Sequence, residues 1–336
     1  MRWLLRILLL ALLAGGAAAG AAWWWLQQPL TLATPSVEVS IEPGASPRRV
    51  VDQWVEAGVQ ASPRWLYEWF RWSGQSRQIR AGSYEIEAGI TPRTLLDKMV
   101  RGDEILESVR LAEGSTFVQM REALARAPSL RPATRDMSAA QVMAALGEPT
   151  LAPEGRFFPD TYAYSRGVSD LTVLKRAHAA MQRRLVSAWA ERAPELPLKS
   201  MEEVLILASI VEKETGRDAD RALVASVFTN RLRIGMPLQT DPTVIYGLGS
   251  AFDGNLRKRD LLADTPFNTY TRRGLPPTPI ALPGAASLRA AVQPATSRAL
   301  YFVARSDGSG GSVFSENLAD HNRAVNQFQR GGKAAP

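Results

Sequence analysis

The chain has 336 residues, enough for about two domains. With 46% hydrophobic and 22% charged residues, its composition is that of a globular protein and excludes intrinsic disorder of the whole chain. The absence of cysteine excludes disulfides, thiolate nucleophiles and Cys-ligated zinc, and two histidines are too few for a three-His metal site. The formal net charge of +7 suits attraction to anionic lipid headgroups or to an acidic polymer, and it equally suits general solubility.

The chain opens on an apolar run. Arg2 and Arg6 precede Ile7–Leu26, which contains no charged residue and is rich in Leu and Ala. A helix of about twenty such residues spans about 30 Å of hydrocarbon. We therefore predict a transmembrane helix over 7–26 that follows a short N-terminal segment, residues 1–6.

The flanks of this run predict its orientation. Trp23–Trp25 at its far end suit the aromatic belt of a membrane interface, and the first Lys or Arg after them is Arg48. The positive-inside rule therefore places residues 1–6 in the cytoplasm, the anchor in the cytoplasmic (inner) membrane and the bulk of the chain in the periplasm. A cleaved signal peptide is the alternative, since Ala17–Ala19 could serve a peptidase that selects small residues. Either way the body of the protein lies outside that membrane, and we expect no nucleic-acid partner.

A short linker, residues 27–36, leads into a small α+β module that we place at 37–105. Alternating polarity and turn or cap residues predict its elements in chain order: strand Val37–Ile41, helices Ser46–Ala57 and Pro63–Trp72, strand Gly82–Glu87, and helix Thr91–Val100.

The second of these helices carries Trp65, Trp69 and Trp72 at positions i, i+4 and i+7, so the three rings share one face. Packing into the core of a small domain is the first interpretation. The alternative is a platform on which sugar rings stack, because aromatic faces pair with the apolar faces of sugars.

The remainder, residues 106–330, reads as a larger mixed α+β domain, and residues 331–336 as a disordered tail. Its expected elements are strand Ser108–Leu111, helices from Thr116 to Arg126, Ala139–Leu146, Leu171–Arg192, Met201–Thr215, Ala219–Arg233 and Ser287–Val292, strands Leu300–Ala304 and Ser312–Phe314, and a closing helix Asn317–Gln329. The fold class is therefore α+β. We expect His178 to be solvated and His321 to be a contact within the closing helix.

Two glutamates end the most apolar of these helices. At 100° per residue, Glu212 and Glu214 point about 200° apart. Glu214 follows the larger apolar neighbours on its own face, including Leu207 and Ile210, and burial there disfavours the carboxylate and raises its pKa. A raised pKa suits a general acid at neutral pH. Plain solvation is the ordinary state of a Glu at a helix end, and we expect it for Glu212.

Four long motifs carry a resemblance to a known family. They read LASIVEKET from residue 207, VASVFTNRLRIGMPLQTDPTVIYGLG from 224, NTYTRRGLPPTPIALPG from 268 and YFVARSDGSGGSVFSENLADHN from 301. They are similar to the endolytic murein transglycosylase family, also described as YceG-like. The similarity covers nearly the whole chain and implies that the small module is LysM-like. The departure is the Pro- and Ala-rich segment 127–152, which bears on substrate preference or partners and not on the chemistry.

The resemblance implies a lyase whose catalytic acid is Glu214, the second glutamate of the EKE motif. Members cleave the MurNAc–GlcNAc bond within peptidoglycan strands and leave 1,6-anhydro-MurNAc ends. The substrate's own C6 hydroxyl is the nucleophile, so one carboxyl group suffices and neither a cofactor nor a metal is expected. With the anchor, this predicts action on nascent strands near the membrane, a role in limiting their length, and peptidoglycan synthases as protein partners.

Two polar loops are candidates for binding the sugars and their N-acetyl groups. Amide and hydroxyl groups can bind such substituents, and structural hydrogen bonding within the fold is the alternative for each residue. The candidates are Gln239, Thr240, Asp241, Asn268, Thr269 and Tyr270.

Two rival functions stay open. A scaffold of the wall-synthesis machinery would need no catalysis, which the intact EKE helix argues against. A muramidase-type hydrolase would use Asp241 as a second carboxylate and would give reducing ends, whereas an Asp before a proline commonly caps a turn.

Overall fold

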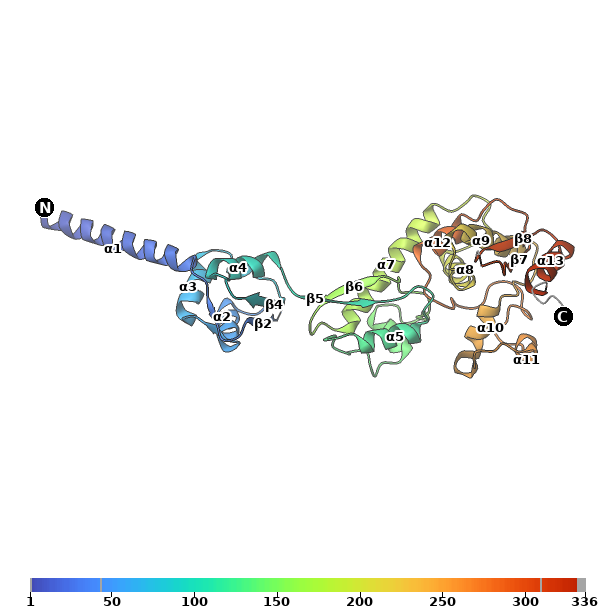
Figure 1. Cartoon of the computed structure of the whole chain (residues 1–336), viewed down its shortest axis with the longest axis horizontal. Helices are drawn as coiled ribbons and strands as arrows, with labels where there is room; N and C mark the ends of the chain where they lie inside the picture. Colours follow the sequence, from blue (N-terminus) through green and yellow to red (C-terminus); the bar gives the residue numbers. More distant parts are fainter. Residues whose placement is uncertain (1, 43, 309, 331–336) are drawn as a thin grey trace. The chain divides into compact units, whose positions relative to one another are not determined.

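The computed structural model describes residues 2–42, 44–308 and 310–330, so the tail expected at 331–336 lies outside the described residues. The chain forms two compact units (Figure 1). The first runs to Glu107 and includes Ala163–Val168; the second comprises Ser108–Tyr162 and the chain from Ser169 onward. Helices and short antiparallel strands occur in both, which confirms the α+β class.

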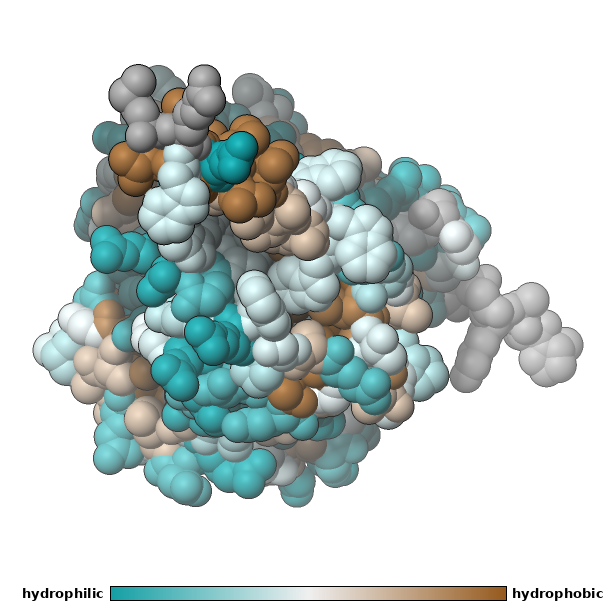
Figure 2. Space-filling view, turned by 90° about the vertical axis from the view of Figure 1, so that its left-hand side faces the viewer, coloured by the Kyte–Doolittle hydropathy of each residue, from teal (hydrophilic) through white to brown (hydrophobic). Residues whose placement is uncertain are grey.

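Helix α1 (Arg2–Leu26) begins earlier than the apolar run predicted. Its Trp3–Leu26 portion is long and apolar enough to cross a membrane, and none of it is buried in the protein. Apolar surface, brown in the space-filling view, gathers on this helix (Figure 2). Length and composition suit a membrane anchor and a signal sequence alike.

The rest of the first unit is built on a two-stranded sheet. Strands β2 (Ser36–Ile41) and β4 (Gly82–Glu87) pair antiparallel, with Ser36 opposite Glu87 and Ile41 opposite Gly82. Alternate residues of β2 are buried, as the period of two predicted. The sheet is accompanied by α2 (Pro47–Glu56), α3 (Pro63–Trp72), the 3₁₀ turn η1 (Ser76–Gln78) and α4 (Pro92–Arg101).

A compact core fills this unit, and the Trp stripe is mostly outside it. Trp54, Leu66 and Phe70 are fully buried, whereas Trp65 and Trp72 are 65% and 78% exposed. The core interpretation of the stripe was therefore wrong for these two rings, because Leu66 and Phe70, about 110° around α3 from the Trp face, supply the core residues.

The segment expected as a linker is partly packed. Leu30 is buried and its N–H donates to the carbonyl of Ile90 at 2.7 Å. Strand β1 (Thr31–Leu32) then pairs with β3 (Val59–Gln60). Such short pairings give no periodic signal in the sequence, so the pattern did not predict them.

Strands β5 (Leu106–Arg110) and β6 (Thr161–Ser165) form a two-stranded sheet, and each strand has residues in both units. The first helices of the second unit are α5 (Phe117–Arg126), α6 (Ala139–Ala145) and the long α7 (Asp170–Ala190). His178 on α7 is buried with its ring 5.9 Å from that of Phe157, so the expectation that it is solvated was wrong.

Helix α8 (Met201–Glu214) is the centre of this unit, with α9 (Asp218–Arg233) and α12 (Ala285–Val292) packed against it. Residues 204–211 are all buried, so α8 is enclosed on every side. A helix that is apolar all round belongs in the interior, as the sequence indicated. Strands β7 (Tyr301–Ala304) and β8 (Ser312–Ser315), helix α13 (Leu318–Val325) and a π-helical turn, Asn326–Arg330, complete the unit.

Two helices were missing from the sequence prediction. They are α10 (Asp241–Leu248), which the 3₁₀ turn η2 (Gly249–Ala251) follows, and α11 (Lys258–Leu262). Part of α10 had been assigned to a loop because of Pro242. Proline is compatible with the first turn of a helix, where its missing N–H is not needed.

Candidate active site

Glu214 is the last residue of α8, where the enclosed helix reaches a polar loop. The Thr240 hydroxyl donates a hydrogen bond to Oε1 of Glu214. Burial raises the pKa of Glu214 to about 7, and the negative charge of Asp241 adds to the rise, while the Thr240 hydrogen bond and the Arg231 charge oppose it. The carboxyl group therefore exchanges a proton near neutral pH, the direction argued from the helix face.

Three threonines hold the loop against its neighbour. The Thr240 N–H donates to Oγ1 of Thr269 at 3.0 Å, and the Thr243 and Thr269 hydroxyls lie 2.9 Å apart. Thr243 also donates to the Thr240 carbonyl at 2.8 Å. All three side chains are buried, so the Thr240 hydroxyl is fixed in position when it meets Glu214.

Arg231 of α9 hydrogen-bonds to the start of the loop that carries Thr240. Its guanidinium donates to the carbonyls of Leu238 and Pro237 at 2.7 and 3.3 Å, and to that of Leu300 at 2.7 Å. The sequence analysis missed this residue. Its signal was an arginine one turn after Phe228 on the buried face of α9.

Asp241 and Tyr270 form a second polar contact. The Tyr270 hydroxyl donates to Oδ1 of Asp241 at 2.5 Å, and Asp241 is exposed at the first turn of α10. Burial, with the Asp241 hydrogen bond and charge, raises the pKa of Tyr270, so this hydroxyl stays protonated at neutral pH. Gln239, which is exposed with a positive φ of 51°, precedes this pair.

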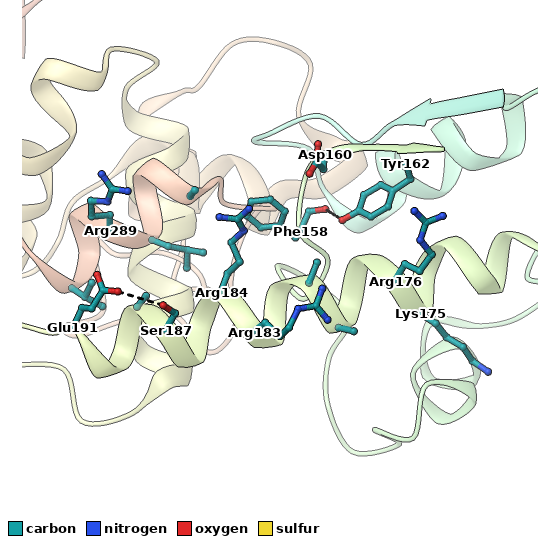
Figure 3. A pocket seen from close by; sticks show the side chains of 16 residues that line it. Phe158, Asp160, Tyr162, Lys175, Arg176, Arg183, Arg184, Ser187, Glu191 and Arg289 are labelled. Atoms are coloured by element: carbon teal, nitrogen blue, oxygen red, sulfur yellow. Dashed lines mark hydrogen bonds between the residues drawn. The ribbon is translucent and has the colours of Figure 1, made fainter. Parts of the chain in front are cut away.

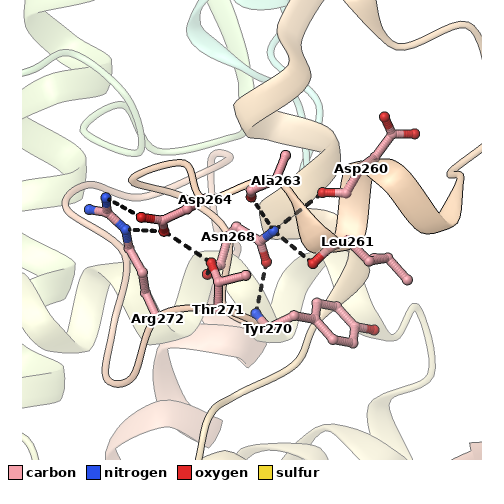
Figure 4. Close-up of polar contacts among 8 residues, drawn as sticks. All are labelled: Asp260, Leu261, Ala263, Asp264, Asn268, Tyr270, Thr271 and Arg272. Carbon is pink, nitrogen blue, oxygen red and sulfur yellow. Dashed lines mark hydrogen bonds and ion pairs between the residues drawn. The ribbon is translucent and has the colours of Figure 1, made fainter.

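Asn268 is fully buried and holds a loop (Figure 4). Its Nδ2 donates to the carbonyls of Asp260, Leu261 and Ala263 at 3.2, 3.0 and 2.6 Å, and its Oδ1 accepts from the Tyr270 N–H at 2.9 Å. With its side chain engaged in this way, Asn268 positions Tyr270 and does not face solvent. Thr269 is likewise buried and hydrogen-bonded within the fold.

Glu212 is not solvated, and that expectation was wrong. Its side chain is only 6% exposed. Its Oε2 accepts from the Gly284 N–H at 2.9 Å, and its Oε1 lies 3.8 Å from the Arg221 guanidinium. Helix α9 and the start of α12 cover this carboxylate, a tertiary arrangement that the helix-face argument could not include.

Glu154 is a second carboxyl group whose pKa is raised by burial, and it was not among the candidates predicted from the sequence. Its Oε1 accepts from the Phe117 N–H at 2.9 Å and its Oε2 from the Tyr246 hydroxyl at 3.1 Å. Burial raises the pKa of Glu154 to about 7. Because Tyr246 lies on α10 and Thr240 at its N-cap, Glu154 and Glu214 contact the same short helix near opposite ends.

A separate groove of about 770 Å³ runs along α7 and α12. It is basic, and Figure 3 shows the cations along its length: Lys175, Arg176, Arg183, Arg184 and Arg289. The Arg184 guanidinium lies 4.4 Å from the ring centroid of Phe158. None of the candidate site residues lines this groove. Within the described ranges, no group of three or more His, Cys, Asp or Glu could hold a metal.

A protonatable carboxyl group at the end of an enclosed helix, with fixed hydroxyls beside it, is the site of an acid–base enzyme. The model of the YceG-like family matches residues 39–327, and the chain belongs to that family. The sequence resemblance is thereby confirmed.

Three relatives illustrate the similarity. An endolytic murein transglycosylase of Bacillus subtilis is 30% identical over 317 residues, which cover 87% of this chain and 85% of that protein. One from Streptococcus pneumoniae is 28% identical and covers 74% of this chain but only 50% of the longer relative. The crystal structure of a putative YceG-like protein from Listeria monocytogenes has a TM-score of 0.55 at 29% identity, with coverage of 86% of this chain and 98% of that one.

Proposed function

We propose that this protein is a peptidoglycan lytic transglycosylase, a lyase that cleaves the MurNAc–GlcNAc bond within glycan strands and leaves 1,6-anhydro-MurNAc ends. The relatives named endolytic murein transglycosylase support the class of reaction. The observation that carries the proposal is Glu214, a single carboxyl group with a pKa of about 7 held by the Thr240 hydroxyl.

The chemistry needs one proton donor and acceptor. Protonated Glu214 donates to the glycosidic oxygen, so the GlcNAc leaves as an alcohol while positive charge develops at C1 of the muramoyl ring. The resulting carboxylate then takes the proton of the C6 hydroxyl, whose oxygen bonds to C1. Glu214 ends protonated and no water is consumed. A hydrolase would instead need a pair of carboxyl groups at a defined separation.

The surrounding residues divide into two groups. Gln239, Asp241 and Tyr270 are at least partly exposed and are our candidates for contacts with sugar hydroxyls and acetamides. Thr240, Asn268 and Thr269 are buried, and we assign them the positioning of Glu214 and of the two loops. The charge of Asp241 raises the pKa of Glu214, so Asp241 also favours the protonated acid.

The N-terminal part would place this chemistry at the membrane. We propose that α1 is an uncleaved anchor in the inner membrane, with residues 1–6 in the cytoplasm and the chain beyond Leu26 in the periplasm. Strands β2 and β4 pair antiparallel with α2 and α3 between them in the chain, which supports the LysM-like assignment. An anchored enzyme would meet nascent strands as they emerge, limit their length and work beside peptidoglycan synthases.

The test is mass spectrometry of peptidoglycan digested by the full chain in detergent, compared with Glu214→Gln. The matched control is Glu203→Gln, at the first turn of the same helix. Anhydro-muramoyl products from the wild type and the control, lost in Glu214→Gln, would support the proposal. Reducing ends would indicate a hydrolase that uses Asp241. Products that persist at the normal rate in Glu214→Gln would contradict the role of Glu214, and no products from any protein would favour a scaffold.

A further inference from the structure

Helix α3 exposes aromatic surface that the first unit does not cover. Trp65 and Trp72 are 65% and 78% exposed, and they share a face with the half-buried Trp69. Leu66 and Phe70, on the other face, are fully buried in the core. A Trp ring that becomes buried removes about 150–250 Å² from water, so two exposed rings on one helix indicate a surface that is covered by something else.

This aromatic face adjoins the end of α1. A mostly apolar groove of about 690 Å³ is lined on one side by α1, over Ala18–Leu26, and on the other by Trp65, Glu68, Trp69 and Trp72. At 1.5 Å per residue, Ala18 lies about 12 Å along the helix axis from Leu26. The α3 rings therefore lie beside the last two turns of the apolar helix, the part that meets the membrane interface if α1 spans the bilayer.

The polar groups around these rings also suit an interface. The indole N–H of Trp72 donates to Glu68 at 3.1 Å, and the Arg71 guanidinium lies 5.5 Å from the Trp72 ring centroid. Arg64 and Arg71 are both exposed on α3, and Arg71 is ion-paired with Glu68 at 2.9 Å. Trp at the headgroup level with Arg beside it is the side-chain pattern of membrane interfaces.

We infer that α3 lies in the membrane interface, with Trp65 and Trp72 inserted at the boundary between headgroups and acyl chains. The partner is the lipid bilayer itself, and the module would be held to it both by α1 and by the aromatic face of α3. An amphipathic helix in this position buries its apolar face about 5–10 Å deep. The inference rests on α1 as an uncleaved anchor, which is part of the proposed function. The continuity of the Trp face with α1 favours lipid over a glycan chain as the occupant.

The cysteine-free sequence allows a direct test with the full chain. Single-cysteine variants Trp65→Cys and Trp72→Cys are labelled with a small environment-sensitive fluorophore and reconstituted in nanodiscs of zwitterionic and anionic phospholipid. Leu12→Cys, in the middle of α1, reports on the anchor, and Val186→Cys, exposed on α7 of the other unit, is the aqueous control. Quenching is measured with spin-labelled lipids that carry the quencher near the headgroup or deep in the chain, and with iodide in water.

We expect the Trp65 and Trp72 labels to be quenched by shallow lipid quenchers and to be at least about five-fold less accessible to iodide than the Val186 label. The Leu12 label should respond to deep quenchers. If Leu12 responds in this way but the α3 labels match Val186, the inference is overturned while the anchor stands. If Leu12 is open to iodide, the anchor fails and the inference with it. Shielding of the α3 labels only after soluble glycan strands are added would also overturn it, in favour of sugar stacking.

Discussion

The Thr240 hydroxyl donates directly to the Glu214 carboxylate across the junction between α8 and α10. This contact joins residues 26 positions apart and opposes the effect of burial on the carboxyl pKa. Thr240 is fixed in position, because its side chain is buried and its backbone N–H donates to Oγ1 of Thr269. The balance between burial and this hydrogen bond therefore sets the pH at which Glu214 can act as an acid.

Thr240→Val removes the hydroxyl and keeps the shape of the side chain. Because a hydrogen bond to the carboxylate favours the charged form, its loss should raise the pKa of Glu214 further. The basic limb of the kcat/KM profile should move up by about one pH unit, and kcat at neutral pH should fall as the carboxylate becomes harder to form. Thr271→Val, which makes no contact with Glu214, is the control. An unchanged profile would contradict the role of Thr240.

Asp241→Asn should move the basic limb of the kcat/KM profile to lower pH, opposite to the effect of Thr240→Val. The negative charge of Asp241 raises the pKa of Glu214, so its removal lowers that pKa, by up to about one unit. The acid is then deprotonated at lower pH, and activity is lost earlier as pH rises. The products should still carry anhydro ends, measured by mass spectrometry of the same digests. Loss of all cleavage together with intact folding would instead favour a catalytic carboxylate at Asp241.

Glu154→Gln tests the buried carboxyl beside Tyr246. The pKa of Glu154 is raised from 4.5 to about 7 in the fold, so the stability it contributes is complete below pH 4.5 and is lost as pH rises through 7. The full loss corresponds to about 3 kcal/mol. Gln resembles the protonated acid, since it can accept from Phe117 and donate to the Tyr246 oxygen.

We therefore expect the unfolding midpoint of the wild type to fall between pH 5 and 8 and that of Glu154→Gln to fall less. Thermal unfolding by circular dichroism at four pH values measures this. Glu195→Gln, at an exposed carboxyl group, controls for the general effect of removing a charge. Parallel curves for wild type and Glu154→Gln would show that Glu154 does not titrate in this range.

Replacing one member of the Glu212–Arg221 pair should lower the stability of the protein. Arg221→Leu leaves the Glu212 carboxylate buried with the Gly284 N–H as its remaining partner in the described part of the chain, and about 3–5 kcal/mol of stability should be lost. The double variant with Glu212→Leu should recover part of that loss, because no uncompensated charge remains. Urea unfolding of both single variants and the double variant gives the coupling energy, and strict additivity would argue against a direct interaction.

Asn268→Ala should act on loop order and not on substrate contact. The side chain holds three backbone carbonyls and the Tyr270 N–H, so truncation leaves buried polar groups unpaired and should destabilise the protein by about 1–3 kcal/mol. We expect kcat to fall because the loop that carries Tyr270 becomes less ordered. Thr278→Ala, outside this network, is the comparison. A large rise in KM at full stability would instead indicate that Asn268 contacts the glycan.

Much of the fold followed from local pattern. The apolar run of α1, the alternation in β2 and the cap and proline signals of α3 and α4 predicted those elements close to their observed limits. The prediction failed at α10, α11, β1, β3 and β6. These segments are too short for periodicity, and their positions are fixed by contacts with other parts of the chain.

The sequence alone determined that α8 lies in a dry interior and that Glu214 and Glu212 point apart, because 3.6-residue periodicity needs only the local order of residues. Tertiary structure decided what each carboxylate meets. Glu212 is paired with the Gly284 N–H from 72 residues away, and Glu154 with a tyrosine 92 residues away. Such long-range partners depend on how the chain returns on itself. These partners place Glu212 beside the Arg221 cation and leave Glu214 to exchange its proton.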